Sequence, residues 1–180
     1  MKKLTAPLDP SLTALLIIDV QQGLFNRANP LYQAEELLAN LNSLAEQARL
    51  AGALVVYIQH YNDGFLAKDT PNWRLHTDLH IQPDDPLIHK QHGNAFEKTE
   101  LKAVLDQRGV SQLVIGGLVS HGCVSATTQG ALDLGYRVIL AQDGHSNFHK
   151  KAAKVVRECN EKLSAAGAEL AACAEITFRA

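Results

Sequence analysis

Short apolar runs alternate with amphipathic helical patterns along the chain. The first run, residues 13–19, is apolar at consecutive positions and ends on a carboxylate. This pattern predicts a parallel strand that is buried on both faces. A helical period follows, and Gly52 is placed to end it. The apolar face of this predicted helix consists of Leu37, Leu41, Leu44, Ala45 and Ala48.

The rest of the chain repeats the alternation of strand and helix. We predict further strands at residues 54–58, 87–90, 112–115 and 137–141, with a sixth over 168–176. The later helices are predicted at residues 99–108, 123–134 and 150–166. Such an order is typical of a parallel sheet with crossover helices. We therefore expect a single α/β domain over residues 1–180. Its fold would be three-layered and Rossmann-like, with a central, mostly parallel sheet of about six strands flanked by helices.

Composition limits the classes of function. The 180 residues are 46% hydrophobic and 20% charged, with a formal net charge of −2, which is typical of a soluble globular protein. No basic stretch indicates nucleic acid or an anionic membrane as a partner, and no apolar run is long enough to span a bilayer. The amino terminus lacks the apolar core of a signal peptide, so we expect a cytoplasmic protein. The three cysteines form no C-x-x-C pair, which indicates reduced thiols.

Three reactive side chains fall at or just beyond predicted strand ends, where open parallel sheets bind their ligands. Asp19 closes the first strand, Lys90 closes the third, and Cys123 follows the fourth. Asp19 could instead cap the turn that follows it, and Lys90 could reach solvent or pair with an acid. Together the three would form a consistent set, in which the lysine holds a thiolate and the aspartate takes and returns a proton.

Cys123 has the strongest physical argument of the three. A thiol at the start of a helix feels the positive end of the helix dipole, which favours the thiolate. The preceding residues 116–122 contain three glycines, and the amides of such a turn could point at a developing oxyanion. The alternative is a buried structural cysteine, which is a common fate of a free thiol.

Four segments in this order resemble the isochorismatase-like cysteine hydrolase superfamily, which includes nicotinamidases, N-carbamoyl amide hydrolases and ureidoacrylate-type amidohydrolases. The first two segments are residues 15–21 with Phe25, and Lys90 with residues 94–96, Thr99 and Leu101. The other two are residues 114–117 with Ser120, Cys123, Val124 and Thr127, and Ala131 with Gly135, Tyr136 and Asp143.

The resemblance implies a triad of Asp19, Lys90 and Cys123 and a cis peptide bond, most naturally between Leu118 and Val119. It further implies an oxyanion hole made by the backbone N–H groups of Val119 and Cys123. The implied reaction is thiolate attack on a carbonyl, departure of ammonia or an amine, and hydrolysis of the thioester by water. Isochorismatases proper lack the cysteine, so its presence here favours cleavage of a C–N bond in a small amide or ureido compound. The resemblance also implies a homo-oligomer.

The family's metal-binding members carry an Asp-x-His motif after the second strand, and this chain has Gln59-His60-Tyr61-Asn62-Asp63 instead. Trp73 and His76 resemble part of that site, but a metal needs three or four convergent ligands. We therefore expect no metal and no cofactor. The pairs His76/His80 and His145/His149 have helical spacing, and we interpret both as polar surface. For the substrate pocket we predict Phe25, Trp73, His60, His92 and His121, and we interpret Cys159 and Cys173 as structural.

Two other classes of protein compete with the hydrolase. A non-catalytic member of the same family could act as a scaffold or small-molecule-binding protein, although the intact Asp19, Lys90 and Cys123 argue against it. A flavodoxin-like nucleotide binder is disfavoured, because no G-x-G-x-x-G or Walker sequence follows the first strand and a carboxylate there would repel phosphate.

Overall fold

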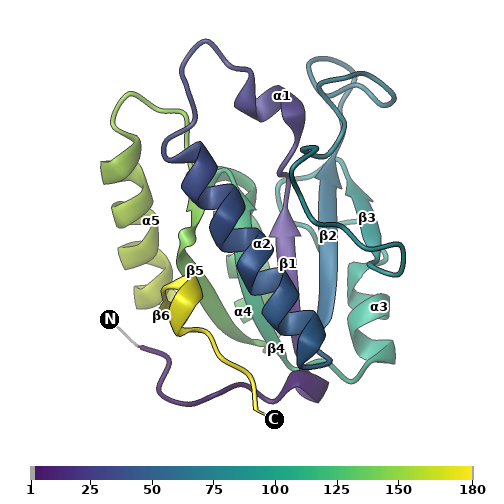
Figure 1. Ribbon diagram of the computed structural model, residues 1–180, viewed down its shortest axis with the longest axis vertical. Coiled ribbons are helices and arrows are strands. Elements are labelled where there is room, and N and C mark those ends of the chain that lie inside the picture. Colours follow the sequence, from purple (N-terminus) through teal and green to yellow (C-terminus); the bar gives the residue numbers. More distant parts are fainter. Residues whose placement is uncertain (1–2, 180) are drawn as a thin grey trace.

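The computed structural model describes residues 3–179. Six strands form one sheet in the order β3-β2-β1-β4-β5-β6, and every neighbouring pair is parallel. The strands are β1 (Thr13–Ile18), β2 (Leu54–His60), β3 (Leu87–Lys90), β4 (Gln112–Leu118), β5 (Arg137–Ser146) and β6 (Glu169–Ala171). The predicted α/β fold with a six-stranded parallel sheet is therefore confirmed (Figure 1).

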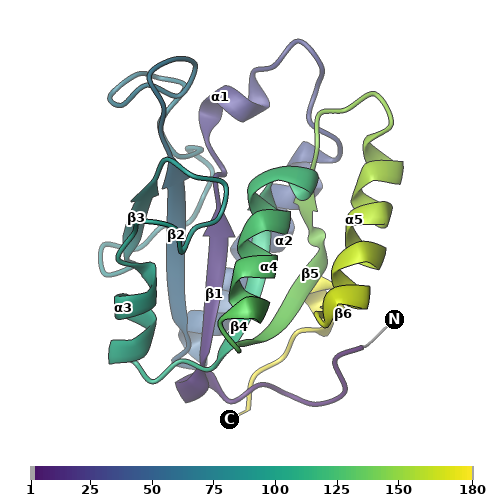
Figure 2. The same cartoon turned by 180° about the vertical axis from the view of Figure 1, so that it is seen from behind.

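Helices cover both faces of the sheet and make three layers. They are α1 (Gln22–Phe25), α2 (Ala34–Leu50), α3 (Leu101–Gln107), α4 (Ser125–Asp133) and α5 (Ala152–Ala166). The long helix α2 crosses one face alone (Figure 1), while α3, α4 and α5 lie on the other (Figure 2). Leu15 and Ile17 of β1 belong to the core beneath α2, whereas Leu16 and Ile18 belong to the opposite core. The continuous apolar run of β1 is therefore explained by burial on both faces.

The direction in which strands are added to the sheet reverses between β1 and β4, because β2 and β3 lie on one side of this parallel pair and β5 and β6 on the other. At their carboxyl ends, Ile18 of β1 is paired with Gly117 of β4. In open α/β sheets a ligand binds in the crevice at such a switch point. The residues that follow β1 and β4 are Asp19 and the turn that contains Cys123.

Several boundaries differ from those predicted. Strands β4 and β5 continue to Leu118 and Ser146, and the last predicted strand is reduced to β6 followed by a 3₁₀ turn, η3 (Cys173–Glu175). Cys123 does not lie in the following α-helix as predicted, but in the turn η2 (Ser120–Val124) that precedes α4. Gly122 interrupts the helical geometry of η2, with φ −111° and ψ −114°.

The connection between β2 and β3 is held against the segment that follows Asp19. The amide of Gln22 donates to the carbonyl of Arg74, and the amide of His76 donates to that of Val20, both at 2.9 Å. The carbonyl of Trp73 accepts two further bonds, from the side chain of Gln21 at 2.6 Å and that of Gln59 at 2.8 Å. The middle of this long loop is therefore fixed beside the carboxyl ends of the strands.

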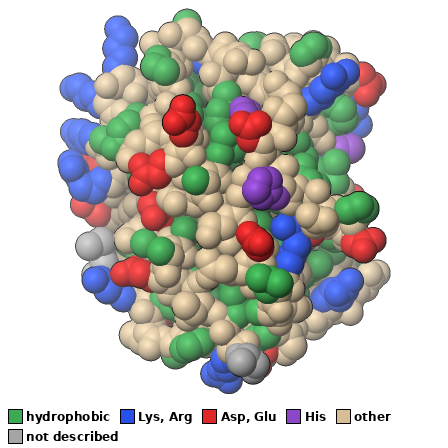
Figure 3. Space-filling model, viewed as in Figure 1, with side chains coloured by type: hydrophobic (Ala, Val, Ile, Leu, Met, Phe, Trp, Pro, Cys, Tyr) green, Lys and Arg blue, Asp and Glu red, His purple; other side chains and the backbone are tan. Residues whose placement is uncertain are grey.

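The surface of the face that α2 crosses carries interspersed acidic and basic side chains, with lysine and arginine gathered along the α5 edge (Figure 3). Within residues 3–179, no helix has both the length and the apolar character needed to cross a membrane.

Candidate active site

Asp19 leaves the end of β1 in a left-handed backbone conformation, with φ 52°. A non-glycine residue rarely adopts this conformation, and such residues cluster at functional sites. Its amide donates to the carbonyl of Ile58 at 2.9 Å, so the residue is held against β2. The residue is 2% exposed, and its side chain does not cap the following turn. One carboxylate oxygen, Oδ2, accepts a bond from Lys90 Nζ at 2.7 Å instead.

Lys90 ends β3 and is 1% exposed, so its charge has to be balanced inside the protein. Its Nζ lies 2.7 Å from Asp19 Oδ2, 3.2 Å from the carbonyl of His92 and 3.3 Å from His60 Nδ1. An ammonium group has three N–H donors. These three acceptors satisfy all of them, which explains how a lysine can end a buried strand.

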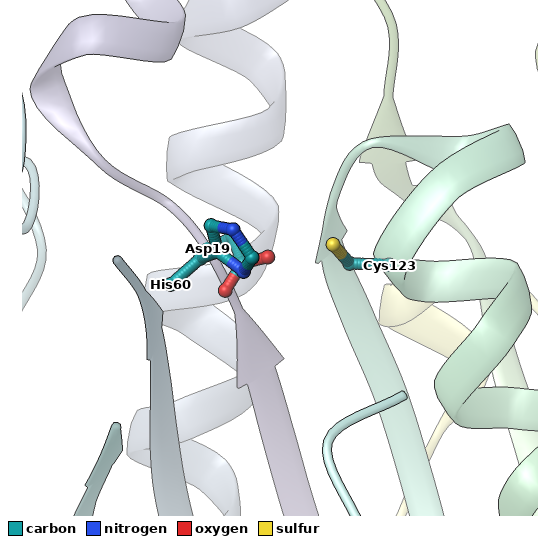
Figure 4. A group of neighbouring side chains, drawn as sticks. All are labelled: Asp19, His60 and Cys123. Carbon is teal, nitrogen blue, oxygen red and sulfur yellow. The ribbon is translucent and has the colours of Figure 1, made fainter. Parts of the chain in front are cut away.

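The side chain of Cys123 points toward Asp19 and His60 at the carboxyl ends of β1 and β2 (Figure 4). The sulfur, a carboxylate oxygen of Asp19 and a ring nitrogen of His60 all lie within 4.8 Å of one another. The structure therefore brings together side chains from the ends of β1 and β2 and from the turn after β4. Lys90, at the end of β3, completes the group through its bonds to Asp19 and His60.

Burial raises the pKa of the Cys123 thiol to about 12, and the negative charge of Asp19 raises it further than the ammonium of Lys90 lowers it. These surroundings oppose the thiolate that the start of a helix would favour. Burial and the charge of Lys90 also lower the pKa of His60, so its imidazole is neutral at pH 7. A neutral ring can accept the bond from Lys90 at Nδ1, and its proton then resides on Nε2.

The second oxygen of Asp19, Oδ1, is buried and has no hydrogen-bond partner among the described residues. A buried carboxylate oxygen without a donor is costly, because it has lost water and gained nothing in return. The side chain of Asp19 also interacts with that of Cys123, and this interaction raises the pKa of the thiol. This arrangement is suited to a group that receives a proton from the thiol.

The turn between β4 and α4 contains a cis peptide bond between Leu118 and Val119. The carbonyl of Val119 accepts the amide of Gly122 at 2.9 Å, which closes the turn back toward Cys123. Beneath it, Gly117 has φ +118°, and a Cβ atom there would lie 2.1 Å from the carbonyl oxygen of Ile18. Only glycine fits this close contact with β1.

The residues predicted to form the substrate pocket lie in different surroundings in the structure. His60 lies in the cluster itself. His92 contributes its carbonyl to Lys90, and its imidazole is 3.4 Å from Glu97. Phe25 packs against the ring of His76, with ring centroids 4.2 Å apart. Trp73 packs against His89, which alternates with Lys90 along β3 and so points to the opposite face of the sheet.

His121 is exposed, and its imidazole contacts the side chain of Asn147. It lines a cavity of about 380 Å³ on the α5 side, together with Ser125, His149, Val155, Glu158, Cys159 and Lys162. His121 thus points toward α5.

Among the described residues, Asp19, His60 and Cys123 are the one group of three metal-ligating side chains with atoms this close together, and His76 and His80 are not part of it. The ammonium of Lys90 already occupies the neighbourhood of two of these ligands, with bonds to Asp19 and to His60. A second cation would be repelled there, so the donor set does not fit a resident metal ion.

Sequence reasoning missed two residues that support the site. Gln21 is fully buried and bonds to both backbone groups of His60, accepting from its amide at 3.1 Å and donating to its carbonyl at 2.8 Å. His145 was interpreted as polar surface, and this is wrong: it is 3% exposed and lies on β5 rather than on a helix. Its spacing from the exposed His149 is therefore not helical. No sequence signal distinguishes a strand histidine of this kind from a surface one.

Comparison with known proteins places the chain in a family. The model of the isochorismatase domain matches residues 13–177. Streptothricin hydrolase from Streptomyces noursei is 39% identical over 144 residues, which are 78% of this chain and 51% of the relative, and a second streptothricin hydrolase is 35% identical over 85% and 63%. The chain thus spans about half to two-thirds of these relatives. Ureidoacrylate amidohydrolase from Caulobacter vibrioides is 28% identical over 82% of this chain and 84% of the relative.

Solved structures share the fold. An isochorismatase from Pseudomonas putida is 26% identical with a TM-score of 0.84, covering 96% of this chain and 94% of the other. A cysteine hydrolase from Pseudomonas syringae is 22% identical with a TM-score of 0.86, covering 97% and 95%. On the match of the family model over residues 13–177, the chain belongs to the isochorismatase-like (cysteine hydrolase) family.

Proposed function

We propose that this protein is a cysteine amidohydrolase that cleaves the C–N bond of a small amide or ureido substrate through a thioester intermediate. One observation carries the proposal. The Cys123 sulfur lies within 4.8 Å of a carboxylate oxygen of Asp19, and Oδ2 of the same carboxylate is paired with the buried ammonium of Lys90. A nucleophile, a proton acceptor and a fixed positive charge therefore lie together at the carboxyl ends of the strands, which is the arrangement that nucleophilic catalysis requires.

In the first half of the reaction, Asp19 accepts the thiol proton as the sulfur attacks the carbonyl carbon. The ammonium of Lys90 stabilises the sulfur while it carries negative charge. The backbone N–H groups of Val119 and Cys123 donate to the carbonyl oxygen as it becomes an oxyanion. When the C–N bond breaks, the leaving nitrogen takes the proton from Asp19 and departs as ammonia or an amine. The acyl group remains on sulfur.

In the second half, water attacks the thioester carbonyl and gives a proton to Asp19. The S–C bond then breaks, the acyl group leaves as an acid, and the thiol regains the proton. Aspartate thus acts as base and acid in turn, and no electrons are transferred to another molecule. Because burial raises the pKa of the thiol, Asp19 is needed to take its proton during attack.

The substrate class follows from the charges of the site and from the relatives. Asp19 and Lys90 neutralise each other, and His60 is neutral, so the crevice presents no net charge to the substrate. This favours a neutral carboxamide or ureido group next to the sulfur. The relatives named for streptothricin and ureidoacrylate hydrolysis fit such chemistry. We further propose that Phe25 and His92 border the pocket. We also propose that the protein is a homo-oligomer and that it works in the cytoplasm.

The test is release of ammonia from a panel of primary amides and ureido acids. We expect turnover by the wild type and none by Cys123→Ala, whereas Cys173→Ala, which removes a buried thiol from η3, retains activity. Iodoacetamide should label Cys123 faster than Cys159 and Cys173, because Cys123 is the one of the three that is not fully buried. Turnover that survives in Cys123→Ala would rule out the mechanism. A silent panel together with a poorly reactive Cys123 would favour a non-catalytic, small-molecule-binding or scaffold protein.

A further inference from the structure

A buried chain of hydrogen bonds supports the turn that carries Cys123. Ser120 is fully buried, and its Oγ lies 2.8 Å from His145 Nδ1 and 2.9 Å from the carbonyl of Ser146. The Nε2 atom of His145 lies 2.9 Å from Asn160 Oδ1, and Asn160 Nδ2 donates to the carbonyl of Gln142 at 3.1 Å. The chain therefore joins η2 to the end of β5 and to α5.

The donor and acceptor of each bond follow from the group at the end of the chain of hydrogen bonds, the carbonyl of Gln142. A carbonyl can only accept, so the amide group of Asn160 has to turn its nitrogen to Gln142 and its oxygen to His145. His145 then donates from Nε2. Because burial lowers the pKa of its imidazole, the ring is neutral and Nδ1 is an acceptor. The single proton of the Ser120 hydroxyl therefore faces two acceptors, His145 Nδ1 and the carbonyl of Ser146, and both contacts hold the hydroxyl in place.

Ser120 is also held through its backbone. The thiol of Cys159 on α5 lies 3.0 Å from the Ser120 carbonyl, so both the side chain and the carbonyl of this residue are tied to neighbouring elements. Ser120 directly follows Val119 and lies three positions before Cys123. It is thus placed between the two backbone N–H groups that are proposed to bind the oxyanion.

We propose that Ser120 and His145 are positioning residues that hold the amides of Val119 and Cys123 in place for the oxyanion, without contacting the substrate. The inference rests on the proposed function only for the identity of these amides as oxyanion donors. His145 is suited to this role because it contacts the turn from β5, through the hydroxyl of Ser120. It also borders a separate cavity of about 210 Å³ that is lined by residues of α2, β5 and α5, including Glu36, Asp143 and Arg157.

The effect on the oxyanion site has to be separated from an effect on the thiol. Alkylation by iodoacetamide needs the thiol and its proton acceptor but no oxyanion donors. Addition of an aldehyde to the same thiol needs the thiol, its proton acceptor and the oxyanion donors. The S–C bond forms as the carbonyl π bond breaks, and the carbonyl oxygen becomes a negatively charged or protonated oxygen at the oxyanion position. The affinity of Cys123 for butanal or benzaldehyde, measured as protection from iodoacetamide, therefore reports the amides without any turnover.

We expect Ser120→Ala to weaken aldehyde protection about tenfold or more while the alkylation rate without aldehyde stays within about twofold, since loss of one oxyanion donor costs about 10²–10³ in rate. His145→Leu should have a similar effect, and the double variant should be no worse than either single one, because the two residues act as a unit. His145→Asn retains an acceptor near the Nδ1 position and should recover part of the loss. Where an amide is turned over, kcat should fall in parallel and KM should not.

The control is Thr13→Val, which removes another buried hydroxyl bonded to a backbone carbonyl, at the opposite end of β1. It should leave protection, alkylation and kcat unchanged. The inference is overturned if Ser120→Ala keeps wild-type aldehyde affinity, if alkylation and aldehyde affinity fall together, or if aldehydes do not protect the wild type. A protein that turns over no amide but shows the predicted loss of protection would contradict the proposed function and support this inference.

Discussion

The ion pair between Asp19 and Lys90 is almost completely shielded from water, with side chains 3% and 0% exposed. Removing two charges from water costs several kcal/mol each, and the pair recovers this cost only through close contact and further hydrogen bonds. The carbonyl of His92 and the ring of His60 supply those bonds on the lysine side. On the aspartate side Oδ1 has no hydrogen-bond partner among residues 3–179, which reduces what the pair contributes to stability.

Lys90→Met should lower the free energy of unfolding by about 3–5 kcal/mol, because it leaves an uncompensated carboxylate in the core. Adding Asp19→Asn should restore part of the loss, so that the double variant costs less than the sum of the two single variants. Urea unfolding of the four proteins measures the coupling. Lys102→Met, which breaks an exposed pair with Asp106, is the control and should change stability only slightly. Additive losses for Asp19 and Lys90 would show that the pair has no such coupling.

The sequence predicted where these residues lie but not their pKa values or hydrogen-bond partners. Asp19 and Lys90 could be placed at one edge of the sheet because each ends a strand. The pKa of Cys123 could not be predicted, since it depends mainly on burial by segments far away in the chain. The role of His145 was also hidden, because neither of its partners, Ser120 and Asn160, is adjacent to it in sequence.

At the scale of elements, the site depends on the close approach of β1 and β4. Gly116 and Gly117 end the apolar part of β4, and their weak preference for strands made the predicted strand stop at Ile115. In the structure the strand continues. The missing side chain of Gly117 lets the backbone of β4 approach that of β1, whereas a Cβ at Gly116 would meet Gly144 and Leu41. The turn that carries Cys123 begins directly after this contact, so the position of the turn is set by the register of the two strands.

Gly117→Ala should lower the free energy of unfolding by about 3 kcal/mol or more, because the new Cβ would meet the backbone of Ile18 in addition to the strain of φ +118°. Gly109→Ala is a matched control. It also has positive φ, +65°, but no atom lies within 4 Å of the position of its Cβ, so only about 1–2 kcal/mol of backbone strain is expected. Equal losses in thermal or urea unfolding would show that steric contact with β1 is unimportant.

At the scale of the whole molecule, the three thiols are shielded unequally from solvent and all have raised pKa values. Burial raises the pKa of Cys159 to about 11 and that of Cys123 to about 12, and it also raises the pKa of Cys173. The folded protein therefore keeps thiol protons that the unfolded chain releases above pH 9. The stability associated with these protons is fully present below pH 9 and is lost as the pH rises toward 12.

Cys123→Ser should reduce the alkaline loss of stability by about 2 kcal/mol between pH 8 and pH 10.5, because the thiol accounts for that much of the difference in proton binding. Urea unfolding at the two pH values measures it. Tyr57, whose pKa is also raised by burial, contributes equally to both proteins. Thr13→Val removes no titratable group and should keep the wild-type dependence. An unchanged loss in Cys123→Ser would mean that the folded thiol titrates near its ordinary pKa.

The anchored carbonyl of Trp73 divides the connection between β2 and β3 into two shorter loops, residues 61–72 and 74–86. Each loop runs from a fixed strand end to the same fixed point beside Asp19. A change of length in one of them consequently leaves the path of the other intact. The protein thus offers two independent places for insertions and deletions, so that the surroundings of the crevice can diversify while the sheet and its reactive side chains stay the same.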